Sequence, residues 1–260
     1  MFPVLFSFGI ISIHTSSLII AIGFLVSLFI FWKMARVEIV EVEKIFDLIL
    51  TIILGAFVMG RLMYVLENYN DFQSKFDRII HVYKFPGFDF WGICLGFIVA
   101  SFYYMKRIKI KRLRILDFLS VSISLFMVFI FLGFFFDGVY AGLNFPSLGV
   151  NLVGYVGKRL PIQLFSAFLF LLFFLFSKNK IDKRNNGFVF WFFTAYLFAN
   201  LLVLEFLRRD KIYFEGVAIN KLLFFSVTMF AVIVIITKYK NIIKSNLQEL
   251  MNNFKIFHHK

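Results

Sequence analysis

The 260-residue chain contains one cysteine, four prolines and only 15 acidic residues, against 28 lysines and arginines. The lone Cys94 excludes an intrachain disulfide and any paired-cysteine metal or redox motif. The four histidines are not spaced as the ligands of known metal motifs, so we predict neither a bound metal ion nor a cofactor. The apolar and basic residues are therefore the main source of information about this protein.

Apolar side chains are in large excess: 61% of the residues are hydrophobic, and 41 are phenylalanine. Soluble proteins use roughly 45–50% apolar residues. Runs such as FSAFLFLLFFLF have no polar face to present to water. Because a helix needs about 20 apolar residues to cross the hydrocarbon of a bilayer, we predict an all-α polytopic membrane protein.

The apolar runs predict seven transmembrane helices. They are expected at residues 16–32, 46–66, 90–105, 115–136, 161–177, 187–206 and 219–237. Residues 1–237 are therefore predicted to form one seven-helix membrane domain.

The net charge of +13 is concentrated in alternate connections between these runs. The stretch KRIKIKRLR holds six basic residues and no acid, whereas residues 67–89 mix three basic with four acidic residues. The positive-inside rule then places the N-terminus outside and the C-terminus in the cytoplasm. This orientation explains the basic residues without a nucleic acid partner. The tail, residues 238–260, is predicted to be a basic amphipathic segment on the cytoplasmic leaflet.

Arg61, in the stretch GRLMYVL, lies near the expected outer end of the second helix. Its side chain could extend to the interface, as long cationic side chains do near helix ends. Alternatively, Gly55 and Gly60 indicate a side that packs closely against another helix. There the guanidinium would offer two parallel donors to a phosphate. Both interpretations remain open from the sequence.

Other polar residues gather at the same outer level. They are His14, Asp137, Gly142, Gln163, Tyr196, Glu205 and Arg208. Together they predict an outer pocket for an anionic ligand, although Glu205 and Arg208 could also form a simple surface ion pair. Asp117, at the expected inner end of the fourth helix, is predicted to pair with its cationic neighbours.

Several segments follow one another in the order seen in a known family. They are FSFGIISIHTSSLIIAIGFLVS, LGAFVMGRLMYVL, FPGFDFWGICLG, ILDFLS, FFDGVYAG, RLPIQLF and NGFVFWFFTAYLFANLLVLEFLRRD. The second of these preserves the family's Gly-Arg-x-x-Tyr-Val element as Gly60, Arg61, Tyr64 and Val65. By these motifs the chain resembles the bacterial prolipoprotein diacylglyceryl transferases, a family with seven spans and an outer N-terminus.

The resemblance implies a reaction and its partners. The family transfers the diacylglyceryl group of phosphatidylglycerol to a lipoprotein signal-peptide cysteine at the bacterial inner membrane, and glycerol phosphate leaves. Carried over, Arg61 is expected to contact the phospholipid phosphate, with Gly60 and Tyr64 beside it. The resemblance also implies that Gly142, Tyr196, Glu205 and Arg208 line the outer pocket.

The chain departs from the family pattern at several polar positions. Trp91 stands where the family has a histidine, and Phe131 and Phe134 stand where it has an arginine and an asparagine. A third expected arginine, near Asn200, is also missing, so His14 is the only candidate base that we name. Two hypotheses follow: an active transferase with rearranged cations, or a non-catalytic relative that binds phospholipid or a signal segment, alone or within a membrane assembly. A transporter is disfavoured because the centres of the helices carry almost no polar residues.

Overall fold

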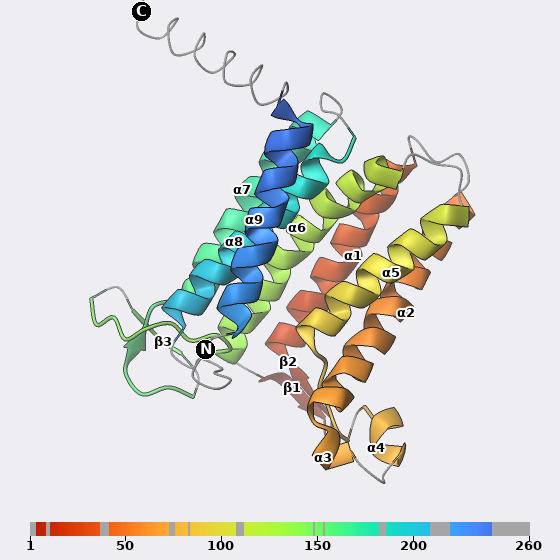
Figure 1. Cartoon of the computed structure of the whole chain (residues 1–260). Helices are drawn as coiled ribbons and strands as arrows, with labels where there is room; N and C mark the ends of the chain where they lie inside the picture. The colour runs from red at the N-terminus through yellow and green to blue at the C-terminus, as the bar shows by residue number, and fades with distance from the viewer. Residues whose placement is uncertain are drawn as a thin grey trace, which may run out of the picture. The chain divides into compact units, whose positions relative to one another are not determined.

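Seven long helices make up most of the residues that the computed structural model describes, which are 4–8, 11–36, 42–72, 76–82, 84–107, 112–147, 149–152, 154–181, 186–208 and 219–240. These helices are α1 (Thr15–Ala35), α2 (Val42–Glu67), α5 (Phe90–Arg107), α6 (Arg112–Asp137), α7 (Ile162–Lys180), α8 (Phe188–Leu207) and α9 (Ile219–Lys238) (Figure 1). Each covers one predicted stretch, and every end lies within four residues of the predicted boundary.

Five of the described helices, α1, α2, α6, α8 and α9, are long and apolar enough to cross a membrane. Helices α5 and α7 are apolar as well, over shorter stretches. The chain is therefore a mostly helical membrane protein. Of the predicted cytoplasmic tail, only residues 238–240 are among those described, and residues 241–260 lie outside them.

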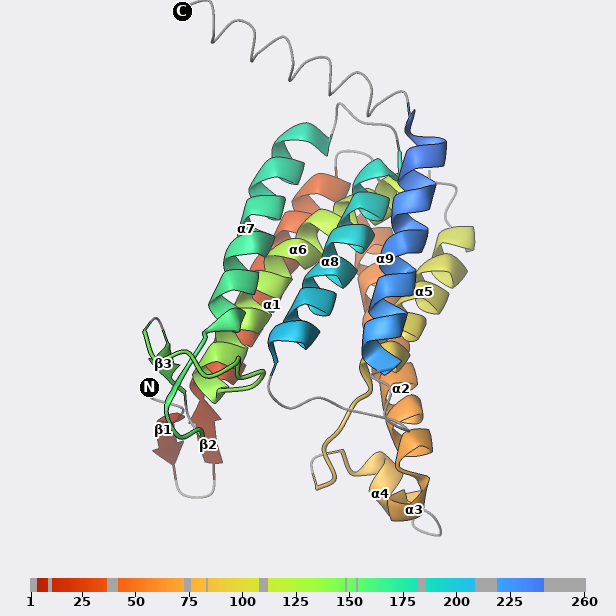
Figure 2. The ribbon, with the colours of Figure 1, turned by 60° about the vertical axis from the view of Figure 1, so that its left-hand side comes forward.

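Short elements that the sequence did not predict precede α1 or lie between the long helices. Strands β1 (Val4–Phe8) and β2 (Ile11–His14) pair in antiparallel fashion, as do β3 (Val150–Asn151) and β4 (Lys158–Arg159). Helices α3 (Tyr69–Phe72) and α4 (Phe76–Ile80) follow α2. Paired segments this short are held by backbone hydrogen bonds and leave little periodic pattern in the sequence, so they were not predicted. In unit 1, defined below, the strands lie at the end where α6 finishes and α7 begins (Figure 2).

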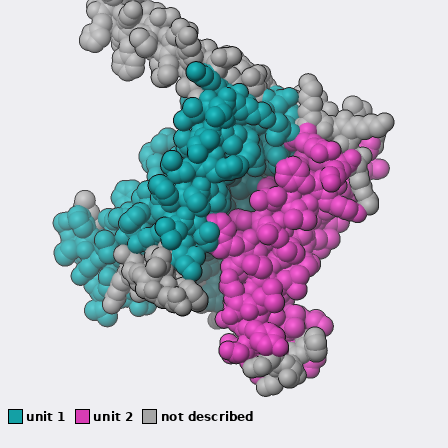
Figure 3. Space-filling model, in the orientation of Figure 1, with its two compact units in different colours: residues 1–31, 113–260 teal, residues 32–112 magenta. Residues whose placement is uncertain are grey.

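The chain divides into two compact units (Figure 3). Unit 1 comprises residues 1–31 and 113–260, and unit 2 comprises residues 32–112. In unit 2, helices α2 and α5 pack side by side through small residues. A Cβ atom on Gly55 would lie 2.5 Å from the Cβ of Ala100, and one on Gly96 would collide with the Gly55 carbonyl. The predicted close packing at Gly55 is thereby confirmed.

Aromatic and apolar side chains fill unit 1 around α6, which buries a larger share of its residues than the other long candidate spans. Helix α1 packs against it closely, because a Cβ on Gly133 would lie 3.0 Å from Ile20. Helices α8 and α9 run side by side, with the rings of Phe198 and Phe224 centred 6.0 Å apart. Such close packing is the main source of stability for helices surrounded by lipid.

Candidate functional site

Arg61 lies on α2, about two turns before the helix ends, and its side chain is 5% exposed. The neighbouring Gly60 faces α5, because a Cβ there would lie 2.6 Å from the side chain of Ile93. The geometry therefore favours the protein-facing interpretation of Arg61 over a side chain extended toward water.

The guanidinium of Arg61 donates hydrogen bonds to three backbone carbonyls of the segment that links α2 to α5. Its Nε donates to Ile79 at 3.2 Å, one terminal nitrogen to Gly87 at 3.0 Å, and the other to Arg78 at 2.8 Å. Three of its five N–H groups are thus used. The two remaining N–H groups are compatible with the predicted phosphate contact, which stays a prediction.

Two aromatic rings complete the surroundings of Arg61. The guanidinium carbon lies 5.6 Å from the ring centre of Tyr64 and 5.2 Å from that of Phe72. Tyr64 also occupies the space beside Gly87, whose φ of +154° and lack of a side chain allow the approach. Gly60, Arg61 and Tyr64 are therefore brought together in unit 2, and together they join α2 to the connection that follows it.

A second group of predicted residues lies at the end of unit 1 where the loop after α6 meets the end of α8. The guanidinium carbon of Arg208 lies 4.7 Å from the ring centre of Tyr140, a residue with a positive φ of 58°. Gly142 pairs with Arg208 through the backbone, and a Cβ on Gly142 would lie 2.5 Å from the carbonyl oxygen of Leu160. Gly142 and Arg208 are thus in direct contact, and the pocket itself stays a prediction.

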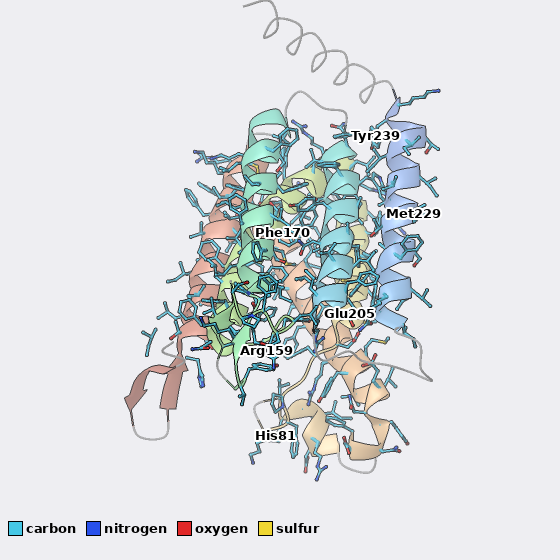
Figure 4. The ribbon with its side chains drawn as sticks, turned by 90° about the vertical axis from the view of Figure 1, so that its left-hand side faces the viewer. His81, Arg159, Phe170, Glu205, Met229 and Tyr239 are labelled. Carbon is cyan, nitrogen blue, oxygen red and sulfur yellow. The ribbon has the colours of Figure 1, made fainter. Side chains whose placement is uncertain are left out.

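Several buried polar atoms in the same unit have no hydrogen-bond partner among the described residues. Gln163 is fully buried and donates from Nε2 to the carbonyl of Val139 at 2.6 Å, while its Oε1 has no partner among the described residues. The same holds for Oε1 of Glu205, Oδ1 of Asn200 and Nε of Arg159. Figure 4 places Arg159 and Glu205 toward one end of the unit 1 helices and Tyr239 toward the other. Buried polar atoms without partners are costly, and such groups at a helix end are suited to a polar ligand.

The remaining predicted residues have other surroundings. Asp137 is the exposed last residue of α6, and His14 is the exposed last residue of β2. Tyr196 packs deeper along α8, with its ring centre 5.6 Å from that of Phe170 and 5.0 Å from that of Phe173. We therefore find Tyr196 in an aromatic cluster, next to apolar rings.

That aromatic cluster occupies positions at which the resemblance implies polar groups. Phe131 is 3% exposed and stacks on Phe170, with ring centres 5.6 Å apart and planes 12° apart. Phe134 meets Phe131 edge-on and lies 5.5 Å from the ring of Tyr140. The space beside Tyr140 is accordingly filled by apolar volume.

The opposite end of unit 1 is organised by Asp117. Its carboxylate accepts hydrogen bonds from the backbone N–H groups of Gly187 and Phe190, at 2.7 and 2.8 Å, and so caps the start of α8. Positive charge from Arg114 also acts on it, as the predicted pairing with cations requires. Beyond α9, burial and the charge of Asp117 raise the pKa of Tyr239, whose hydroxyl donates to the carbonyl of Asn186 at 2.9 Å.

Two features at the end of unit 1 that contains Arg208 were not predicted from the sequence. Arg159 is 8% exposed and pairs through its backbone with Asn144, although its only signal was its place as the first residue of RLPIQLF. Tyr140 supports Arg208, and neither its positive φ nor this long-range contact could be read from spacing. Among the described residues, no group of three His, Cys, Asp or Glu side chains could hold a metal ion.

Comparison with known proteins identifies the family. The sequence model of one family, described as prolipoprotein diacylglyceryl transferase, matches residues 3–239. The chain belongs to this family. Proteins named phosphatidylglycerol–prolipoprotein diacylglyceryl transferase are similar to it. The one from Rickettsia bellii is 26% identical over 231 residues, covering 81% of this chain and 83% of its own length.

Other relatives of the same name come from distant bacteria. The protein of Caldanaerobacter subterraneus is 26% identical over 199 residues, covering 75% of this chain and 73% of its own length. That of Geobacter sulfurreducens is 28% identical over 214 residues, covering 80% and 82%. The resemblance noted in the sequence motifs is thereby confirmed over most of the chain.

Proposed function

We propose that the chain acts in lipoprotein lipidation by transferring a diacylglyceryl group from phosphatidylglycerol to the cysteine of a lipoprotein signal peptide. The observation that carries this proposal is the family match across residues 3–239, together with relatives that are named for this reaction. In the transfer, the thiolate sulfur bonds to the glyceryl carbon, the bond from that carbon to the phosphate oxygen breaks, and glycerol phosphate leaves. The thiol proton passes to a base.

The polar groups at the outer end of unit 1 suit this chemistry. Arg208 would neutralise charge that develops on the phosphate, because a cation placed there stabilises the leaving group. The unpartnered oxygens of Gln163 and Glu205 would accept hydrogen bonds from the hydroxyl groups of the lipid glycerol. Separately, within unit 2, the two remaining N–H groups of Arg61 suit the predicted contact with a phospholipid phosphate. Exposed His14 is our candidate for the base.

The proposal includes an arrangement in the membrane. All seven long helices would span the inner membrane of a bacterium, with the N-terminus outside and the C-terminus in the cytoplasm. The distribution of basic residues supports this orientation, since KRIKIKRLR falls between α5 and α6. Cysteine-accessibility labelling of the connections from each side of the membrane tests the orientation directly.

The transfer is tested with purified full-length protein, phosphatidylglycerol and a signal peptide that carries the target cysteine. We expect a lipidated product whose yield falls at least about a hundredfold in Arg208→Ala, as loss of one transition-state contact typically costs about 2.7–4 kcal/mol. Lys178→Ala is the matched control. Lys178 also lies over an aromatic ring, that of Phe174, but it is not one of the residues proposed to contact the substrate. Equal rates in the two variants would remove Arg208 from the mechanism.

A second candidate function is supported by the stacked pair Phe131 and Phe170. Because these rings exclude a cation from the position where the family carries one, the chain would bind phospholipid or a signal segment without catalysing transfer. This candidate predicts that phosphatidylglycerol remains with the purified protein and is lost from Arg208→Ala, while no lipidated peptide forms at high protein concentration. Detectable turnover by the wild type decides against it.

A further inference from the structure

We propose that the connection between α2 and α5 carries a surface that inserts shallowly into the lipid bilayer. We call this surface the foot and define it by Arg78, Ile80, Lys84, Phe85 and Phe88. It lies in unit 2, and its function requires no catalytic activity.

The foot is held at the membrane boundary by its position in the chain. Helix α2, a candidate span, ends at Glu67, and the apolar helix α5 begins at Phe90. The intervening segment returns the chain to the same end of the same helix pair, since α2 and α5 pack side by side. Side chains that project from this segment are therefore close to the lipid headgroups.

Exposed apolar surface continues from α2 onto the foot. Ile80 is 78% exposed, and it lies on the same connection as the exposed rings of Phe85 and Phe88. Phe88 is 38% exposed, and its ring centre lies 5.0 Å from that of Phe57, itself 49% exposed on α2. The exposed apolar face of the candidate span thus continues onto Phe88 of the connection, and lipid is the occupant that suits both.

The charged residues of the foot favour the interface over the hydrocarbon core. The guanidinium carbon of Arg78 lies 4.9 Å from the ring centre of Phe85, and Lys84 is exposed next to that ring. Phenylalanine rings beside Lys and Arg side chains are typical of segments that lie at the boundary between lipid and water. There the rings enter the boundary region, and the cations remain at the phosphates.

Arg61 holds the foot in place. Its three hydrogen bonds end on the carbonyls of Arg78, Ile79 and Gly87, which lie within the foot or beside it. The backbone N–H of Asp89 also donates to the carbonyl of Gly60 at 3.0 Å. A segment fixed in this way loses little conformational freedom on contact with lipid, so the surface is organised before it inserts.

The experiment uses full-length protein in vesicles of phosphatidylglycerol and phosphatidylethanolamine. In a Cys94→Ser background, Ile80→Cys is labelled with an environment-sensitive fluorophore, and Asn70→Cys is labelled as the control. Asn70 is exposed on α3 in the same connection but is polar. Quenching is measured with lipids that carry a quencher just below the headgroup, and with iodide in the surrounding water.

We expect lipid-borne quencher to act several-fold more strongly on the Ile80 label than on the Asn70 label, and iodide to show the opposite order. Equal access of iodide to both labels would overturn the proposal. Strong quenching of the Ile80 label by iodide, together with weak quenching by the lipid-borne quencher, would also overturn it. Both labelled sites are exposed, so the labels themselves should not disturb folding.

Discussion

Replacing Arg61 by lysine distinguishes two roles of this residue. If its positive charge alone matters, the ammonium of lysine supplies it. If the fork of N–H donors matters, lysine cannot serve carbonyls at three positions, because its single nitrogen reaches only a small volume. The structure predicts that the connection between α2 and α5 opens far more often in Arg61→Lys than in the wild type.

The magnitude follows from the contacts. Hydrogen bonds to charged groups contribute about 1.5–3 kcal/mol each, and three are made at 2.8–3.2 Å by a side chain that is 5% exposed. Lysine would keep one of them, and the freed carbonyls would regain water once the connection opens. We therefore expect a loss of about 3 kcal/mol, which corresponds to about a hundredfold larger open population.

Limited proteolysis measures this population. Trypsin cleaves after Arg78 and Lys84, both within the connection, and its rate follows the open fraction when opening and closing are fast. Arg36→Lys is the control, because Arg36 lies over the ring of Trp32 and is exposed. Cleavage of Arg61→Lys at the wild-type rate would refute the reasoning and leave the phosphate contact as the explanation of Arg61.

Three further predictions address other parts of the fold. Gly96→Leu should separate α2 from α5 and lower the unfolding temperature in detergent, at a cost of about 1–3 kcal/mol for overpacking, whereas Val99→Leu, at an exposed position of α5, should not. Asp117→Ala should lower the free energy of unfolding by about 2 kcal/mol through loss of the cap on α8, and Asp117→Asn should lower it less. Thermal unfolding measures both, and equal losses would contradict the cap. Phe131→Arg should destabilise the protein by about 3 kcal/mol or more, because it buries a charge at a 3% exposed position of a candidate span. Stability equal to the wild type would show that the site has room for a cation.

The long helices could be predicted from the sequence because their signal is local. A run of apolar residues has the same meaning wherever it lies in the chain, and the seven helices accordingly begin and end close to the predicted boundaries. The pattern of glycines was also sufficient to indicate a protein-facing side at Gly55 and Gly60. The family likewise could be identified from motifs in order, which need no knowledge of their spatial arrangement.

Hydrogen-bond partners could not be predicted in the same way. Arg61 was expected at the interface or on a phosphate, whereas its donors also reach carbonyls 17–26 residues away in the chain. Asp117 was assigned to nearby cations, and its bonds to amides 70 and 73 residues away were not foreseen. Residue type states only what a polar group can donate or accept, while the partner depends on how distant segments fold back.

The sequence by itself therefore determined the class of the protein, the positions of the long apolar helices among the described residues, and its family. Only the tertiary structure decided that Arg61 organises the connection after α2, that Arg208 rests on Tyr140, and that Phe131 stacks on Phe170. The physical reason is that burial of apolar surface is encoded residue by residue, whereas a polar site exists only where separate segments bring their donors and acceptors within about 3 Å of one another.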